Sequence, residues 1–164
     1  MSKTEFTIRK AVREDAEFIL TMIHELARYE RLEDQITATV EDIRSSLFDR
    51  KEAEVIIGQV GDTPAAFALY YYSYSTFLGR ANLFLEDLFV KEEFRGRGYG
   101  KAMLQHLAQI ATENGCRRLD WLCLDWNSPA IVFYKGLGAE VLDDRRVFRI
   151  SGERLTELAQ SGLH

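Results

Sequence analysis

The chain has 164 residues, 46% of them hydrophobic and 29% charged, which is enough for one globular domain with a substantial core. Its formal net charge of −5 at pH 7 argues against general nucleic-acid affinity, because such affinity needs a broad basic surface. No apolar run approaches the roughly 20 residues of a membrane span, and the N-terminal MSKTEFTIRK lacks a signal peptide's apolar segment. Cys116 and Cys123 form no CxxC motif, so we expect reduced thiols. These features predict a single domain over residues 1–164, located in the cytoplasm, with no nucleic-acid or membrane partner.

Apolar periodicity predicts the elements of the first half of the chain. Alternating residues indicate strands, and apolar residues three or four positions apart indicate helices. Thr39 is typical of a helix N-cap, and Gly61-Asp62-Thr63-Pro64 is typical of a turn. In chain order we expect a strand at 6–9, helices at Glu14–Glu30 and Val40–Phe48, and strands at Ala53–Val60 and Ala65–Tyr74 that form an antiparallel hairpin.

The second half predicts a β-α-β unit. An apolar strand precedes a glycine-rich loop, and a helical pattern then runs from near Lys101 to Asn114-Gly115. We expect strands at Asn82–Val90 and Arg118–Leu124, a short helix at Ser128–Lys135, and two closing strands at Ala139–Leu142 and Val147–Ile150. A crossover of this kind makes its two strands parallel. The predicted fold class is therefore α/β with a mixed sheet: an antiparallel meander, a β-α-β unit and C-terminal strands.

The loop Arg95-Gly96-Arg97-Gly98-Tyr99-Gly100, followed by Lys101, is the most informative motif. Three glycines in six residues allow a tight turn that exposes successive N–H groups. The helix N-terminus that follows adds unpaired N–H donors and the positive end of its dipole. With three cations in an otherwise acidic chain, the loop is predicted to bind a phosphate.

Several known glycine motifs do not fit this loop. A Walker A loop requires glycine where Arg95 stands and a hydroxyl where Ala102 stands. A dinucleotide fingerprint would place its third glycine at Lys101, and an RGG segment would repeat. A solvated turn without a ligand remains an alternative. The pattern (Arg/Gln)-x-x-Gly-x-(Gly/Ala) is met, and through it the chain resembles the Gcn-five-related N-acetyltransferases, in which this loop holds the acetyl-CoA pyrophosphate.

The resemblance covers nearly the whole chain and is most specific toward the diamine (spermidine/spermine) and thialysine N-acetyltransferase group. It implies the N-acetyltransferase fold, acetyl-CoA as co-substrate, a small-molecule amine as the second substrate, no metal, and a homodimer. The matching segments are Glu25-Leu26-Ala27-Arg28-Tyr29-Glu30, Leu85-Glu86-Asp87-Leu88-Phe89-Val90, Leu124-Asp125-Trp126-Asn127, and Phe133-Tyr134-Lys135 with Gly138-Ala139.

Two residues match the family's catalytic groups. An alkyl amine has a pKa near 10.4, so a carboxylate must help it lose a proton, directly or through water. The resemblance assigns this role to Glu86, and it makes Tyr134, a phenol that stays protonated at neutral pH, the acid for the leaving thiolate. Asp87 is expected to face the opposite side of the strand. An ion-paired structural role is the favoured interpretation for Asp87 and the alternative for Glu86. No nucleophile–base pair for a covalent intermediate is present, so we expect direct transfer in a ternary complex.

The resemblance also implies the contacts of the two substrates. The acceptor amine would meet Tyr29 and Glu30, for which a solvated helix end is the alternative, together with Glu86, Asp120, Trp121 and Leu122. Three histidines, His24, His106 and His164, lack metal-ligand spacing. For the coenzyme the expected contacts are the backbone of Leu88, Phe89 and Val90, the loop Arg95–Lys101, and Asn127, Ser128, Pro129 and Ala130, with Asn127 capping its helix.

The choice of amine rests on one departure from the pattern. Polyamine-specific members carry an acid where this chain has Ser75, and a polycation benefits from several acids. The sequence therefore favours thialysine or another lysine-like or diamine acceptor. A spermidine/spermine acetyltransferase, or a non-catalytic acyl-CoA-binding module on the same fold, are the alternatives.

Overall fold

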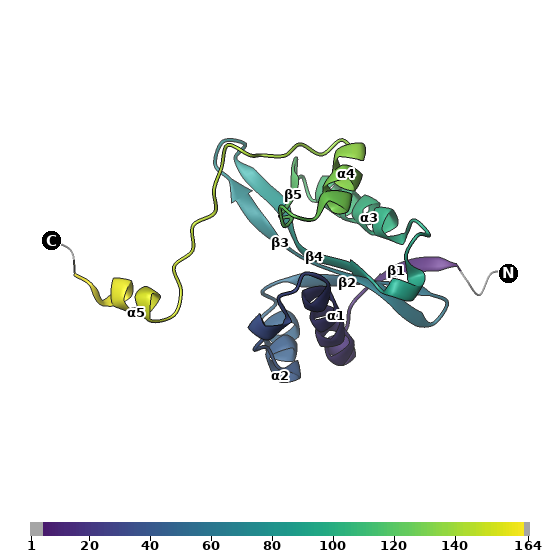
Figure 1. Cartoon of the computed structure of the whole chain (residues 1–164), viewed down its shortest axis with the longest axis horizontal. Helices are drawn as coiled ribbons and strands as arrows, with labels where there is room; N and C mark the ends of the chain where they lie inside the picture. The colour runs from purple at the N-terminus through teal and green to yellow at the C-terminus, as the bar shows by residue number, and fades with distance from the viewer. Residues whose placement is uncertain (1–4, 163–164) are drawn as a thin grey trace. The chain divides into compact units, whose positions relative to one another are not determined.

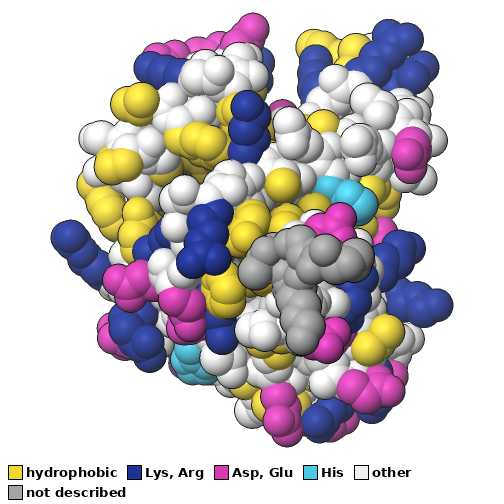
Figure 2. Space-filling model, turned by 90° about the vertical axis from the view of Figure 1, so that its right-hand side faces the viewer, with side chains coloured by type: hydrophobic (Ala, Val, Ile, Leu, Met, Phe, Trp, Pro, Cys, Tyr) yellow, Lys and Arg dark blue, Asp and Glu magenta, His cyan; other side chains and the backbone are white. Residues whose placement is uncertain are grey.

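The computed structural model describes residues 5–162, so the expectation for His164 lies outside the described residues. The chain forms two compact units, Met1–Leu124 and Asp125–His164. No helix among residues 5–162 is long and apolar enough to cross a membrane. Acidic and basic side chains are interspersed over the face seen in Figure 2.

The first unit is built on a five-stranded sheet with the order β1-β2-β3-β4-β5 (Figure 1). The first four strands are antiparallel neighbours, and β5 runs parallel to β4. This arrangement confirms the predicted meander followed by a β-α-β unit. The strands are β1 (Phe6–Lys10), β2 (Glu54–Val60), β3 (Thr63–Ser75), β4 (Arg80–Val90) and β5 (Leu119–Trp121).

Helices cover both faces of this sheet (Figure 1). The apolar stripe of α1 (Ala16–Tyr29) packs with α2 (Val40–Ile43) on one face, where Ile19, Met22, Ile57, Phe67 and Phe89 form the core. The opposite face carries α3 (Tyr99–Glu113), whose Met103, Leu104 and Leu107 are buried. Short 3₁₀ turns lie at Arg13–Asp15, Glu33–Gln35 and Glu92–Phe94.

Local signals placed most of these elements within a few residues. The Thr39 hydroxyl accepts from the Asp42 N–H at 3.1 Å, and the Asp42 carboxylate accepts from the Thr39 N–H at 2.9 Å, so the predicted N-cap is confirmed as a reciprocal capping box. The helix expected to Phe48 changes to a π-helical turn, Arg44–Asp49. β5 is shorter than expected, and α3 begins at Tyr99 rather than near Lys101.

The second unit differs from the prediction. It contains α4 (Ser128–Gly136), as expected, and α5 (Glu153–Gln160), which was not predicted. The strands expected at Ala139–Leu142 and Val147–Ile150 are wrong, because residues 139–150 contain no strand. Alternating apolar residues make a strand only when a neighbouring strand completes the backbone hydrogen bonds and covers one face. Here Val147 and Phe148 are 72% and 91% exposed.

Candidate active site

One edge of β4 is open toward the glycine loop. β4 pairs with β3 over most of its length, but β5 pairs only with Leu83, Phe84 and Leu85. The Lys91 N–H donates to the Ala65 carbonyl at 2.9 Å. Antiparallel ladders alternate between bonded and non-bonded pairs, so the backbone groups of Leu88 and Val90 point away from β3, whereas those of Phe89 bond to it. The strand therefore presents N–H and C=O groups on its open side.

A β-bulge in β4 lies just before this open edge. Leu69 of β3 pairs with Asp87, whereas Tyr70 pairs with Leu85, so Glu86 is the extra residue on β4. A bulge disrupts the ladder locally and re-aims side chains. Glu86 is exposed and Asp87 is half-buried. The predicted catalytic carboxylate thus stands where the strand backbone leaves its regular register.

Asp87 has an unusual electrostatic environment. Burial, reinforced by the nearby charges of Glu86 and Glu30, raises its pKa to about 7. Among the described residues its side chain has no ion-pair partner. The ion pair expected for Asp87 is therefore not found within residues 5–162. The site holds a carboxyl group that titrates close to neutral pH.

The end of α1 approaches the bulge. Glu30 is half-buried, and this burial raises its pKa. Its charge acts on Asp87, so the end of α1 lies near the carboxylates at the bulge of β4. Tyr29 is 44% exposed, so the solvated helix end stays an alternative for that residue, whereas Glu30 is partly removed from solvent.

Tyr71 also lies in this region, although no sequence motif distinguishes it. Burial and the Glu86 carboxylate both raise the pKa of its phenol. Its ring lies 5.2 Å from that of Phe84. The available signal was the run Tyr70-Tyr71-Tyr72, but the sequence alone does not show which of the three faces the carboxylates.

An open cavity of about 510 Å³ lies beside Tyr71. Apolar lining comes from Leu47, Phe48 and Val55, and both signs of charge are present in Lys10, Lys51, Glu52 and Glu54. Among residues 5–162, no group of three or more His, Cys, Asp or Glu could hold a metal ion.

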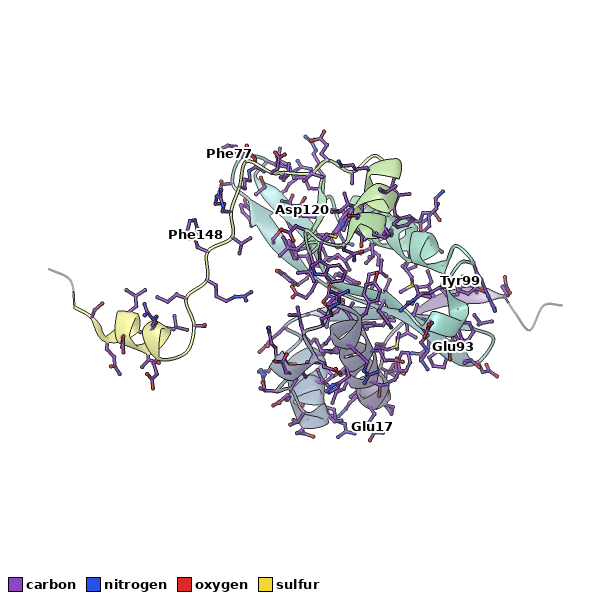
Figure 3. All side chains as sticks on the ribbon, viewed as in Figure 1. Glu17, Phe77, Glu93, Tyr99, Asp120 and Phe148 are labelled. Atoms are coloured by element: carbon purple, nitrogen blue, oxygen red, sulfur yellow. The ribbon has the colours of Figure 1, made fainter. Side chains whose placement is uncertain are left out.

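The remaining predicted acceptor residues lie in β5 or directly after it. Asp120 and Trp121 belong to the strand, and Leu122 is the next residue. Asp120 pairs with Phe84 and Trp121 with Leu85, directly before the bulge. Both are half-buried, whereas Leu122 is exposed. Asp120 is labelled on β5 in Figure 3. The fold therefore brings Asp120 and Trp121 next to Glu86 along adjacent strands.

The glycine loop has the conformation that its sequence predicts. Gly96 and Gly98 have φ values of 77° and 82°, in the left-handed region that favours glycine. Gly98 is the N-cap of α3, and a Cβ at either glycine would meet no atom within 4 Å. The loop therefore has open space around Gly96 and around Gly98, the residue that precedes α3. Tyr99, labelled in Figure 3, stacks its ring on Phe6 of β1 at 4.1 Å.

The three cations of the loop have different neighbours. The guanidinium of Arg95 lies over the rings of Phe89 and Tyr29, at 4.9 and 5.4 Å, and its Nε–H donates to the Val90 carbonyl at 2.9 Å. The guanidinium of Arg97 lies 5.7 Å from the ring centre of Phe94, in the 3₁₀ turn that precedes the loop. Lys101 is exposed on the first turn of α3, beside the half-buried Gly100.

The second unit carries the other predicted residues. Asn127 is buried and caps α4, with its side-chain carbonyl accepting from the Ala130 N–H at 3.4 Å, as predicted. Ser128 and Pro129 form the first turn, where the missing N–H of proline costs no helical bond. Tyr134 is half-buried in the same helix, and its ring lies 5.6 Å from that of Phe133.

Comparisons with known proteins identify the family of this chain. The family model of the acetyltransferase (GNAT) family matches residues 17–139. A thialysine N-epsilon-acetyltransferase of Bos taurus is 39% identical, over 93% of this chain and 96% of that protein. The spermidine/spermine N(1)-acetyltransferase-like protein 1 of Homo sapiens is 33% identical over 94% of this chain and 24% of that protein. The structure of an integron cassette protein from the mobile metagenome of V. cholerae superposes with a TM-score of 0.81, at 29% identity over 98% of this chain and 99% of that one.

The fold and the matched family define the class of protein as an acyltransferase with a mixed α/β acetyltransferase fold. The chain belongs to the GNAT acetyltransferase family and is an N-acetyltransferase.

Proposed function

We propose that this enzyme transfers the acetyl group of acetyl-CoA to the primary amine of a lysine-like small molecule such as thialysine, by direct attack in a ternary complex. The observation that carries the proposal is the open edge of β4, which runs from the carboxylates at the bulge to the glycine loop. Acetyl-CoA can be held along this edge while the acceptor amine is deprotonated by a carboxylate beside it.

The coenzyme half of the proposal rests on backbone donors. The Leu88 and Val90 groups on the open edge suit the pantetheine amides, which would add to the sheet as a further strand does. The N-terminus of α3, opened by Gly96 and Gly98, suits the pyrophosphate. Asn127, Ser128, Pro129 and Ala130 form the capped start of α4, and we assign them to the coenzyme arm by family resemblance.

The chemical half of the proposal rests on the carboxylates. Glu86 is exposed at the bulge and is proposed to bind the ammonium form of the acceptor and to receive its proton. Asp87 and Glu30 add negative charge nearby, which favours a cation at this point. Tyr134 is proposed to protonate the departing thiolate, since a phenol is protonated at neutral pH.

The choice of a lysine-like amine is supported by two features. Ser75 is buried, and its hydroxyl accepts from the Leu78 N–H at 3.2 Å and from Arg118 at 3.5 Å. A neutral serine with a cation beside it therefore occupies the position where polyamine-specific members carry an acid, which disfavours a polycation. The cavity beside Tyr71 carries both signs of charge, as a zwitterionic far end would need. The curated relatives from Bos taurus and Sus scrofa act on thialysine, by their names.

A spermidine- or spermine-type acceptor is the second candidate, because the human relative at 33% identity is named for that activity. A non-catalytic acyl-CoA-binding module on the same fold is a further reading, and family membership as an N-acetyltransferase argues against it. We further propose a homodimer, supported by the exposed apolar residues of 139–150, and a cytoplasmic location, supported by the free thiols of Cys116 and Cys123.

The test is steady-state turnover of acetyl-CoA with thialysine and with spermidine, measured as released thiol. We expect kcat/KM to be at least about tenfold higher for thialysine, since one well-placed charge contact changes binding by that order. In the same assay Tyr134→Phe should keep coenzyme affinity and lose on the order of a hundredfold in kcat. A parent that prefers spermidine would overturn the acceptor assignment, and a variant within about threefold of the parent would remove Tyr134 from the mechanism.

A further inference from the structure

Arg95 connects three segments of the first unit. It is placed at the start of the glycine loop, on the C-terminal side of β4. Its guanidinium lies over Phe89, which belongs to the core packed against α1, and over Tyr29, the last residue of α1. Its Nε–H also donates to the Val90 carbonyl on the open edge of β4. One side chain thus contacts the coenzyme edge and the acceptor end of α1.

We propose that Arg95 is a positioning residue that couples binding of the coenzyme to binding of the acceptor amine. The inference rests on the proposed function, because it takes the β4 edge and loop as the coenzyme site and Tyr29 and Glu30 as the acceptor site. Coenzyme that pairs with Val90 and the loop orders the Arg95 backbone and the Val90 carbonyl. The guanidinium, anchored on that carbonyl, then holds the Tyr29 ring and with it the end of α1.

The direction of the side chain separates this role from a phosphate contact. α3 and the N–H groups at its start lie on one face of the sheet, whereas Phe89 and α1 lie on the other. Arg95 reaches the α1 face, where its guanidinium lies over two rings while its Nε–H donates to the Val90 carbonyl. The ammonium of a lysine is a point charge on a flexible stem and does not hold these contacts together in a fixed planar geometry.

Arg97 provides a matched control within the same loop. It has the same charge and also lies over a ring, but that ring is Phe94, three residues earlier in the 3₁₀ turn that precedes the loop. Its Nη2 donates to the Glu93 carbonyl in the same turn at 3.5 Å. Among the described residues, Arg97 has no side-chain hydrogen bond, ion pair or ring contact outside residues 93–97, and it therefore cannot transmit coenzyme binding to α1 by the same route.

The coupling is measured without turnover, by calorimetric titration of thialysine in the absence and presence of saturating CoA. Linkage requires that CoA and the amine change each other's affinity by the same factor. We expect CoA to tighten amine binding to the parent and Arg95→Gln to reduce that factor about three- to fivefold, the range of a cation–π contact. Arg95→Lys should behave like Arg95→Gln, although it keeps the charge. Arg97→Gln should weaken CoA binding and leave the coupling factor within about 1.5-fold of the parent.

A double-mutant cycle with Tyr29 completes the test. Tyr29→Phe retains the ring and should retain the coupling, whereas Tyr29→Leu should lower it and add nothing further in the Arg95→Gln background. Four results would overturn the inference. The coupling factor could be absent in the parent, unchanged in Arg95→Gln, reduced equally in Arg97→Gln, or restored to the parent value by Arg95→Lys. If the parent turns over neither thialysine nor spermidine in the thiol-release assay, the proposed function is contradicted instead. That result is measured separately from the coupling factor.

Discussion

At the scale of single residues, the site depends on how β4 distributes its charges. Two adjacent carboxylates would normally point to opposite sides of a strand and cost free energy where they are buried without partners. The bulge leaves Glu86 exposed and moves Asp87 into a half-buried position near Glu30. The chain keeps this arrangement although it opposes folding when the carboxyl group is ionised, which is typical of functional sites.

This environment makes the stability of the enzyme depend on pH in a defined direction. The folded-state pKa of Asp87 is raised from 3.8 to about 7, so the folded state binds more protons than the unfolded state between those values. The free energy of unfolding contributed by Asp87 therefore falls as the pH rises from about 4 to about 7 and stays low above that range. Asp87→Asn should be more stable than the parent at pH 8, on the order of 2 kcal/mol, with the difference disappearing near pH 4.

Thermal unfolding of both proteins at pH 4 and pH 8 measures this difference. Asp62→Asn, in the exposed turn between β2 and β3, controls for the loss of a carboxylate elsewhere on the first unit. An Asp87→Asn variant that is less stable than the parent at pH 8 would mean that a stabilising partner holds the charge of Asp87.

At the scale of elements, the start of α3 is the feature on which coenzyme binding depends. Gly98 ends the loop in the left-handed conformation and begins the helix at Tyr99. The stack of Tyr99 on Phe6 ties this first turn to β1, so the N–H groups in front of it are held in place. An anion site of this kind needs both the donors and the empty space before them.

A pair of glycine variants distinguishes steric blocking of the anion site from the backbone strain that alanine causes at positive φ. Gly98 and Gly115 both have positive φ, 82° and 75°, and an added Cβ at either would meet no atom within 4 Å. Alanine at each position should therefore impose a similar backbone strain, about 1 kcal/mol. Only Gly98→Ala places a methyl group before the N-terminus of α3, so its CoA affinity should fall at least about tenfold while Gly115→Ala retains the parent value. Calorimetry with CoA and thermal unfolding of both variants check this, and equal CoA affinities would remove the loop from the coenzyme site.

At the scale of the whole molecule, residues 139–150 have a strand-forming sequence but no strand partner among the described residues. They alternate as strands do, yet none of them is in a strand, and Val147 and Phe148 are largely exposed. Unpaired strand-forming segments of this kind are commonly covered by pairing with another chain. A second copy of this chain is the partner that the proposed homodimer supplies.

Phe148 is the residue that best tests the homodimer. Phe148→Glu places a charge on an apolar side chain that is 91% exposed in the single chain, so burial in a dimer would become costly. Light scattering after size exclusion should show a dimer for the parent and for Phe148→Tyr, and a shift toward monomer for Phe148→Glu. A monomeric parent at micromolar concentration would contradict the proposal.

The sequence by itself determined the elements and motifs that depend on near neighbours along the chain. Apolar periodicity located α1, α3 and the first four strands, Thr39 and Asn127 were identifiable as caps, and the glycine loop indicated a phosphate site. These features are short-range, because helical turns, caps and tight turns are made by residues within a few positions of one another.

Only the tertiary structure decided the features that depend on partners far along the chain. The bulge at Glu86 arises from the register between β3 and β4, and the raised pKa of Asp87 comes partly from Glu30 at the end of α1. The direction of Arg95 toward Tyr29 follows from the packing of α1 against the sheet. The strands expected within 139–150 failed for the same reason, since a strand needs a neighbour that its own sequence does not specify. The local sequence pattern determines which secondary structures a segment favours, and the tertiary contacts decide whether the segment adopts them.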